Sequence, residues 1–188
     1  MNLLLKDIAQ LQSGVYLKAK EEQGEVAYLL GIKDFDDNFH LTQPSVRIDK
    51  KEVKEKYIVQ KDHVLFSSRL VFNAFYLPDS NEVYVASNSF MLIKPNLEKV
   101  IPNYLRWFLN HPHTQQKLVQ LAQGSSRMPY ISQKKLETFS VKLPDLAIQK
   151  QIAAVVDLMN TEKKLRQKLI NKREKYIQSI LLNTLKNE

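Results

Sequence analysis

The sequence predicts an α+β fold: an irregular, β-rich domain with short helices, followed by one long C-terminal helix. Two observations carry this prediction. Apolar runs rich in Val, Phe, Tyr and Ile fill the first 100 residues and are separated by prolines and turn-forming segments. From Asp145 to the end there is no Pro or Gly, and apolar residues recur at helical spacing. We therefore expect one domain over residues 1–145 and a helical segment over 146–188.

Six segments of the first domain have the composition of strands. They are residues 26–30, 56–60, 63–68, 70–77, 82–87 and 89–94. The stretch 77–82, LPDSNE, lies between two of them and is typical of a hairpin turn. Strands and helices do not alternate regularly, so we expect a mostly antiparallel arrangement and no doubly wound sheet.

Helical spacing begins after residue 100. Residues 102–110, PNYLRWFLN, start with Pro at a first helical position and place Leu105, Phe108 and Leu109 on one face. A second helix follows, capped by His113 or Thr114, and Gly124 is a natural stop for it.

The chain then returns to short elements before the long helix. Ser132 is placed to cap a short turn, and residues 139–144, FSVKLP, read as one more strand that Pro144 ends. Asp145 is a plausible N-cap for the long helix, whereas Gln149 lies too far along to complete a capping box.

We expect the apolar residues of the long helix to form one stripe. A solitary helix of about 40 residues cannot bury such a stripe, so it must pack along its own domain or against another chain. The stripe residues are Ile152, Val156, Met159, Leu165, Leu169, Tyr176 and Ile180.

The net charge of +8 indicates an anionic partner, most often nucleic acid, although a surplus of this size also serves solubility. Residues 146–188 are the more basic part, with nine Lys and Arg against four acidic residues.

The sequence contains no self-contained catalytic constellation. There is no Cys, and the four glycines form no phosphate-binding loop. His111 and His113 flank Pro112 without further clustered ligands, so we expect no metal site. No apolar run approaches the roughly 20 residues that span a bilayer, and the N-terminus is a poor signal peptide. These features favour a cytoplasmic, non-catalytic protein that binds or scaffolds.

Several segments together resemble a known family. HVLFSSRLVF (63–72), VASNSFMLIKP (85–95), PNYLRWFLN (102–110), LAQGSSRMPYIS (121–132) and LETFSVKLPDLAIQKQIAAVVDLM (136–159) occur in this order. This series is similar to the DNA specificity subunit of type I restriction–modification systems. No single segment identifies the family, but the order and spacing of the segments over about 100 residues do.

The resemblance implies a function. Such subunits carry target recognition domains, each of which reads half of a split sequence in double-stranded DNA. Long helices separate these domains and dock methyltransferase (modification) subunits, which bind S-adenosylmethionine, while a restriction subunit cleaves. The specificity subunit itself needs no cofactor and does no chemistry.

The chain departs from the family pattern in size. The family's usual member has two recognition domains and two helical segments, and this sequence has one of each. Either it is half-sized by nature or it is a fragment. A half-sized form is expected to form a homodimer, in which two long helices pair as an antiparallel coiled coil and present identical domains to a palindromic target with a spacer.

Candidate DNA contacts lie in four places. The strand end VLFSSRL offers an arginine, whose fork suits phosphate or guanine; the loop GSSRMPY offers hydroxyls, charge and an aromatic ring; lysines follow Gly14 and Gly31. The expected residues are Lys18, Lys20, Lys33, Ser67, Ser68, Arg69, Ser125, Ser126, Arg127 and Tyr130. The alternative is a solvated arginine, an ordinary connector with Tyr130 in the core, and surface lysines. The corresponding alternative function is a protein–protein scaffold without DNA readout.

Overall fold

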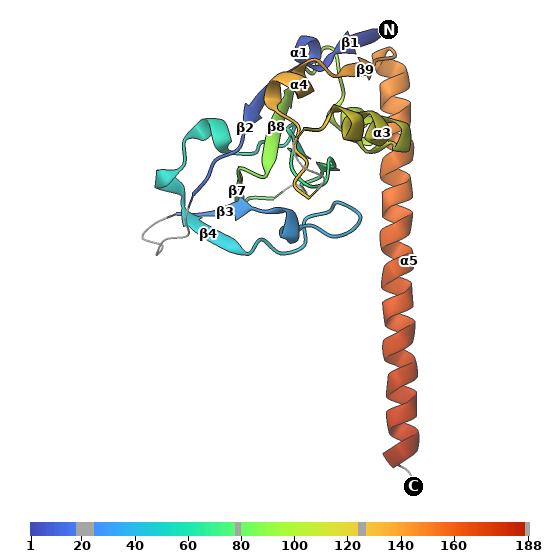
Figure 1. Cartoon of the computed structure of the whole chain (residues 1–188). Helices are drawn as coiled ribbons and strands as arrows, with labels where there is room; N and C mark the ends of the chain where they lie inside the picture. The colour runs from blue at the N-terminus through green and yellow to red at the C-terminus, as the bar shows by residue number, and fades with distance from the viewer. Residues whose placement is uncertain (18–24, 78–79, 124–126, 187–188) are drawn as a thin grey trace.

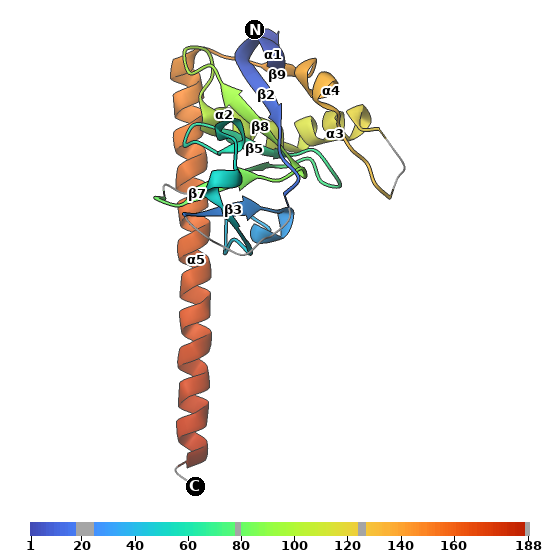
Figure 2. The ribbon, with the colours of Figure 1, turned by 90° about the vertical axis from the view of Figure 1, so that its left-hand side faces the viewer.

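The chain folds into a body, residues 1–144, and one long helix, α5 (Leu146–Lys186), that lies along one side of the body and extends well past it (Figure 1). The computed structural model describes residues 1–17, 25–77, 80–123 and 127–186. Beyond Asn160, every described α5 side chain is exposed, so the second half of the helix projects free of the body. Seen from the side, α5 lies opposite α3 and α4 (Figure 2).

Strands of the body form three sheets within the described residues. The largest has the order β2-β8-β5-β6 and is antiparallel throughout; a second has the order β4-β3-β7, in which β3 and β7 run parallel. A two-stranded sheet, β1-β9, brings the N-terminus of the chain close to the N-terminal end of α5. The strands are β1 (Asn2–Leu4), β2 (Ala9–Ser13), β3 (Val26–Leu30), β4 (Val46–Asp49), β5 (Val64–Ser67), β6 (Ala74–Phe75), β7 (Val83–Ala86), β8 (Phe90–Pro95) and β9 (Ser140–Lys142).

Short helices cover one face of the largest sheet. Their side chains and those of the sheet share a core that includes Leu5, Phe66, Ile93, Leu105 and Leu118, each 0% exposed. The helices are α1 (Leu5–Ile8), α2 (Pro102–Asn110), α3 (Pro112–Leu121) and α4 (Gln133–Glu137); three 3-10 turns, η1 (Ile32–Asp34), η2 (Lys50–Glu52) and η3 (Glu55–Tyr57), lie among the strands.

A second core fills the space between the two larger sheets and is rich in aromatic residues. Phe75 and Phe90 are buried within it. Phe35 and Phe39 pack against it, with ring centroids 4.6 Å and 5.6 Å from that of Phe75. Offset and edge-on aromatic pairs at such distances contribute beyond the area they bury, so this cluster holds the loop after η1 to the sheet.

Polar contacts cap α5 and attach it to the body, and those of Gln149 are buried. Asp145 caps the helix as predicted, because its Oδ1 accepts a hydrogen bond from the Ile148 amide at 2.8 Å. Gln149 is 1% exposed and bonds three backbone groups: its Oε1 accepts from Ile101 N at 2.9 Å, and its Nε2 donates to the carbonyls of Lys99 (3.1 Å) and Pro144 (2.9 Å). Asp157 completes the attachment by accepting from Asn103 of α2 at 3.0 Å.

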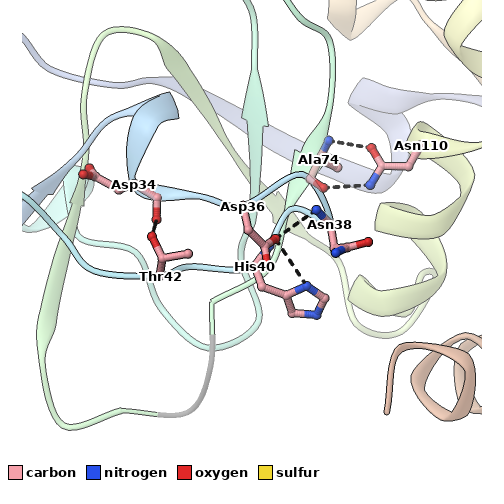
Figure 3. A network of polar contacts seen from close by, with 7 residues as sticks. All are labelled: Asp34, Asp36, Asn38, His40, Thr42, Ala74 and Asn110. Carbon is pink, nitrogen blue, oxygen red and sulfur yellow. Dashed lines mark hydrogen bonds and ion pairs between the residues drawn. The ribbon is translucent and has the colours of Figure 1, made fainter. Parts of the chain in front are cut away.

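Five strand and helix predictions are confirmed closely, and two predicted strands are largely wrong. β3, β5, β7, β8 and α2 form where expected. Residues 56–60 form η3 and an isolated bridge from Ile58 to Val85, and of 70–77 only Ala74–Phe75 is strand. Asn110 explains the short β6, because its side chain bonds both backbone groups of Ala74 (2.7 and 2.8 Å; Figure 3) and so replaces a neighbouring strand.

The predicted hairpin over 77–82 is also wrong. β6 and β7, which flank it, belong to different sheets, so the segment crosses between layers; residues 78–79 lie outside the described residues. The cap of α3 is His111, whose Nδ1 accepts from the His113 amide at 3.4 Å, and neither His113 nor Thr114 caps it. Ser132 occupies the N-cap position of α4 without a side-chain hydrogen bond.

Candidate nucleic-acid interface

Two loops that the sequence singles out are joined in space by their backbones. Arg69 and Tyr130 form an antiparallel bridge, and Tyr130 forms a second one with Gln123, with N–O distances of 2.8 and 2.9 Å. The Leu70 amide donates to the Pro129 carbonyl at 3.0 Å, and the Ile131 amide donates to the Ser68 carbonyl at 2.9 Å. Residues 67–71 and 127–131 therefore form one continuous, backbone-bonded edge of the body.

The two serines of the first loop support this edge from within. Ser67 is 0% and Ser68 is 6% exposed. The Ser67 hydroxyl donates to the Arg69 carbonyl at 3.0 Å, and its amide donates to the Asn73 carbonyl at 2.8 Å. This burial argues against the predicted DNA contacts by Ser67 and Ser68, because neither side chain is exposed at the surface.

Leu70 lies at the apex of a strained turn. The Val71 amide donates to the Arg69 carbonyl at 2.7 Å and closes a three-residue turn around Leu70, whose φ is 66°. Left-handed backbone is unfavourable for a side chain such as leucine, and a γ-turn with positive φ is the rarer, strained form. Leu70 is nevertheless 56% exposed. Strain of this kind persists where the surroundings impose it, here through the Pro129 and Arg69 carbonyls.

The exposed side chains of these loops define the Arg69–Arg127 surface, which consists of Arg69, Leu70, Val71, Arg127, Met128 and Tyr130. Two guanidinium groups lie among exposed apolar side chains, and neither 67–71 nor 127–131 contains an acidic residue. Guanidinium groups suit phosphates and guanine edges, and apolar side chains suit thymine methyl groups and base or sugar faces. Tyr130 is 40% exposed and therefore is not a core residue.

The remaining predicted contacts lie elsewhere. Lys33 is exposed on η1, after β3, and the structure does not bring it into the bonded edge formed by the two loops. Lys18, Lys20, Ser125 and Ser126 lie outside the described residues, as does Gly124.

A second basic surface lies between α5 and the loop after η1. The Asp36 carboxylate accepts from the amides of Asn38 and His40, both at 2.9 Å, and fixes this loop (Figure 3). A groove of about 500 Å³ separates the loop from Lys163, Lys164, Arg166 and Lys168 of α5. Burial and then the charge of Lys164 lower the pKa of His40, which lines the groove. The groove thus places the His40 imidazole among four cationic side chains.

The apolar residues of α5 lie on two faces, which corrects the prediction of one stripe. Ile152 and Val156 are partly buried toward the body, together with the buried Ala153. The step from Met159 to Leu165 is six residues, which at about 100° per residue turns the side chain by about 240°. The exposed face accordingly lies opposite the body and holds Val155, Leu158, Leu165, Leu169, Tyr176 and Ile180, between 46% and 70% exposed.

The comparison with known families decides the assignment. A family model described as the type I restriction modification DNA specificity domain matches residues 2–175. The chain belongs to this family. A relative in the family, the type I restriction enzyme HindI specificity subunit of Haemophilus influenzae, is 29% identical over 104 residues, which cover 54% of this chain and 23% of that protein.

Solved structures of specificity subunits have the same fold as this chain. The HsdS subunit from Thermoanaerobacter tengcongensis superimposes with a TM-score of 0.63 at 17% identity, covering 86% of this chain and 37% of that one. The type I S subunit from M. genitalium superimposes with a TM-score of 0.61 at 12% identity, covering 86% and 39%. These matches confirm the predicted α+β fold class, a β-rich domain with short helices followed by a long C-terminal helix. The chain spans about a quarter of the curated relative and less than two fifths of these structures.

No helix among the described residues is both long and apolar enough to cross a membrane. Those residues also hold no group of three or more His, Cys, Asp or Glu arranged to bind a metal ion.

The sequence reasoning missed three residues that shape this specificity-domain structure. Leu70 carries no sign of positive φ, because Gly or Asn is the usual marker. Gln149 appeared only as a failed capping-box partner. Arg106 is 6% exposed, with its guanidinium carbon 4.2 Å from the Tyr76 ring centroid and a nitrogen 3.8 Å from Asp157; burial lowers its pKa. From the helical spacing of residues 102–110, Arg106 was expected neither on the apolar face nor among the DNA contacts.

Proposed function

We propose that this chain is a DNA sequence-specificity component of a type I restriction–modification system, and that the Arg69–Arg127 surface contacts one half of a split DNA target. The observation that carries the proposal is the joining of the two loops through Arg69 and Tyr130. It supports DNA contact because it presents two arginines, exposed apolar side chains and no acidic residue on one rigid edge. A rigid edge loses little conformational entropy on binding.

Each side chain of the surface has a proposed task. Arg69 and Arg127 bind phosphate oxygens or a guanine edge, and the strained Leu70 supplies an apolar contact to bases, such as a thymine methyl group. Tyr130 packs against sugar or base. Ser67 and Ser68 shape the turn from inside the body. Lys33, which lies apart from this surface, stays a prediction as a further contact, as do Lys18, Lys20, Ser125 and Ser126, which lie outside the described residues.

The exposed face of α5 supports the second half of the proposal, a homodimer. Six large apolar side chains on a projecting helix are stable in water chiefly when a second surface covers them. Pairing of two α5 helices would hold two bodies apart and present them to a palindromic target with a spacer. The paired helices would also be the docking site for methyltransferase subunits, which bind S-adenosylmethionine and modify the DNA; a restriction subunit would cleave it. This chain would supply no catalytic group and no cofactor of its own.

Selection from a random DNA library tests this function. The chain is incubated with duplexes of random sequence, with and without its methyltransferase partner, and the bound DNA is sequenced. We expect two inverted half-sites at a fixed spacing, enriched more strongly when the partner is present. Enrichment of no sequence under either condition would favour the alternative, a protein–protein scaffold without DNA readout.

A further inference from the structure

The exposed face of α5 has a spacing that reads the same in both directions. The face residues Leu158, Glu162, Leu165, Leu169, Lys172 and Tyr176 are separated by four, three, four, three and four positions. This is the heptad alternation of a coiled-coil seam. Because the pattern is symmetric about residue 167, the helix is complementary in spacing to a copy of itself that runs in the opposite direction.

The chemistry of the face is symmetric in the same way. In an antiparallel pair centred on residue 167, Leu165 lies opposite Leu169 of the second copy and Leu158 lies opposite its Tyr176. Glu162 then lies opposite Lys172 of the second copy, with Arg173 next to it. Glu162 is the one acidic residue between positions 158 and 173, so this register matches its charge twice, once in each half of the pair.

Other arrangements of the two helices lose this match. Moving the centre of the pair by half a heptad in one direction places Glu162 opposite Leu165, and moving it in the other direction places Lys172 opposite Leu169; each leaves a charged group facing a leucine. A parallel, in-register pair places Glu162 against Glu162 and Lys172 against Lys172, and like charges at a seam are destabilising. The charges therefore select both the direction and the register.

The body leaves this face free. Gln149, Ala153, Val156 and Asn160 point toward the body, whereas every described α5 side chain after Asn160 is exposed. Glu162 already pairs with Arg166 of its own helix, four residues on, with an N–O distance of 2.5 Å. Both partners of that pair are more than half exposed, so it is a weak surface ion pair that does not prevent Glu162 from turning to a second helix.

We propose that two copies of this chain pair antiparallel through α5 with the two-fold axis at residue 167, and that the Glu162–Lys172 contact, formed twice, sets the register. The proposal rests on the homodimer of the proposed function and specifies its geometry. The two attachment points near Ala153 are then separated by about 42 Å along the helices, at a rise of 1.5 Å per residue. The two bodies lie on the outer sides of the pair, and the register fixes their separation.

Engineered disulfides test the register directly, because the chain has no cysteine and gives no background. In the Leu165→Cys/Leu169→Cys variant, each new cysteine faces its counterpart in the second copy, so mild oxidation is expected to give a covalent dimer with two cross-links. Leu165→Cys alone is the matched control for a parallel pair and should stay uncross-linked. Leu158→Cys/Leu169→Cys is the control for a register shifted by half a heptad, in which these two positions would face each other, and it should also stay uncross-linked. All three sites are exposed, so the body is expected to fold as in the parent chain.

Charge reversal gives a second, independent readout. Glu162→Lys should weaken dimerisation by about tenfold in sedimentation, because each half of the pair then holds three cations together. Combining it with Lys172→Glu and Arg173→Glu should restore dimerisation. A dimer that forms no 165–169 cross-link, or that the charge exchange fails to restore, overturns the register and leaves the homodimer standing. A chain that remains monomeric at tens of micromolar overturns both.

Discussion

Arg69 and Tyr130 are paired across an antiparallel bridge although they come from loops that follow different elements, β5 and α3. The pairing turns two separate motifs into one edge, and it places the arginine of the first motif beside the aromatic residue of the second. This relationship is the basis of the proposed DNA contact, because either motif alone is an ordinary connector.

Removing the two arginines should weaken DNA binding and its dependence on salt. Each of Arg69→Ala and Arg127→Ala is expected to lower the slope of log affinity against log salt by about one if the lost contact is to a phosphate. Titration of labelled target DNA at several salt concentrations measures both the affinity and the slope. Lys6→Ala, which removes an exposed charge on α1, is the control and should change neither value beyond a small uniform effect. If Lys6→Ala behaves like the two arginine variants, the binding reflects net charge and not this surface.

Replacing Leu70 with glycine should separate stability from function. Glycine adopts the φ of 66° without a steric cost, so Leu70→Gly is expected to raise the free energy of unfolding by about 1 kcal/mol. The same variant should bind target DNA less tightly, because the apolar contact is lost. Leu97→Gly is the matched control: Leu97 is 52% exposed but has no positive φ, so its replacement should not stabilise the chain. A Leu70→Gly variant that binds DNA as well as the parent chain would remove Leu70 from the contact surface.

Gln149 should be essential for the attachment of α5. Gln149→Ala leaves the Ile101 amide and two carbonyls without their buried partner, and each unsatisfied group costs about 1–3 kcal/mol. Chemical denaturation followed by circular dichroism is expected to report a loss of about 3 kcal/mol. Gln151→Ala, on the exposed side of the same helix turn, should lose only a few tenths. Equal effects for the two variants would mean that the Gln149 contacts contribute little.

Stability should fall in mild acid because of His63. Burial, followed by the charge of Lys94, lowers the pKa of His63 from 6.5 to about 4, and its Nδ1 accepts from the Gln60 amide at 3.0 Å. The unfolded chain therefore binds the proton more readily between those two values, so stability is lost as the pH falls from about 6.5 toward 4. His63→Asn keeps an acceptor but does not titrate, and it should flatten this part of the pH–stability curve. The exposed His113→Asn should follow the parent curve; if it flattens the curve equally, His63 is not the cause.

Local signals predicted the elements that depend on local chemistry. Pro102 at a first helical position gave the bounds of α2, and Asp145 marked the start of α5, because caps and helix-breaking residues act within one turn. Strands β5 and β8 of the largest sheet also followed from composition, since both are buried and almost continuously apolar.

Contacts between distant segments were outside the reach of those signals. Nothing in LPDSNE distinguishes a hairpin from a crossing between sheets, and the bridge from Arg69 to Tyr130 uses backbone groups that every residue carries. The buried serines illustrate the same limit, because Ser67 and Ser68 lie at a loop whose backbone bonds the distant segment 129–131. By contrast, the two faces of α5 were predictable: the six-residue step after Met159 already excludes a single stripe.

The most direct test of the account is a map of methylated DNA in cells that carry the complete restriction–modification system, with and without this chain. We expect one split, palindromic motif that is methylated when the chain is present and unmethylated when it is deleted. Complementation with the Arg69→Ala/Arg127→Ala variant should restore methylation poorly, and complementation with Lys6→Ala should restore it fully. A methylation map that is the same with and without the chain would contradict the proposed role in DNA specificity.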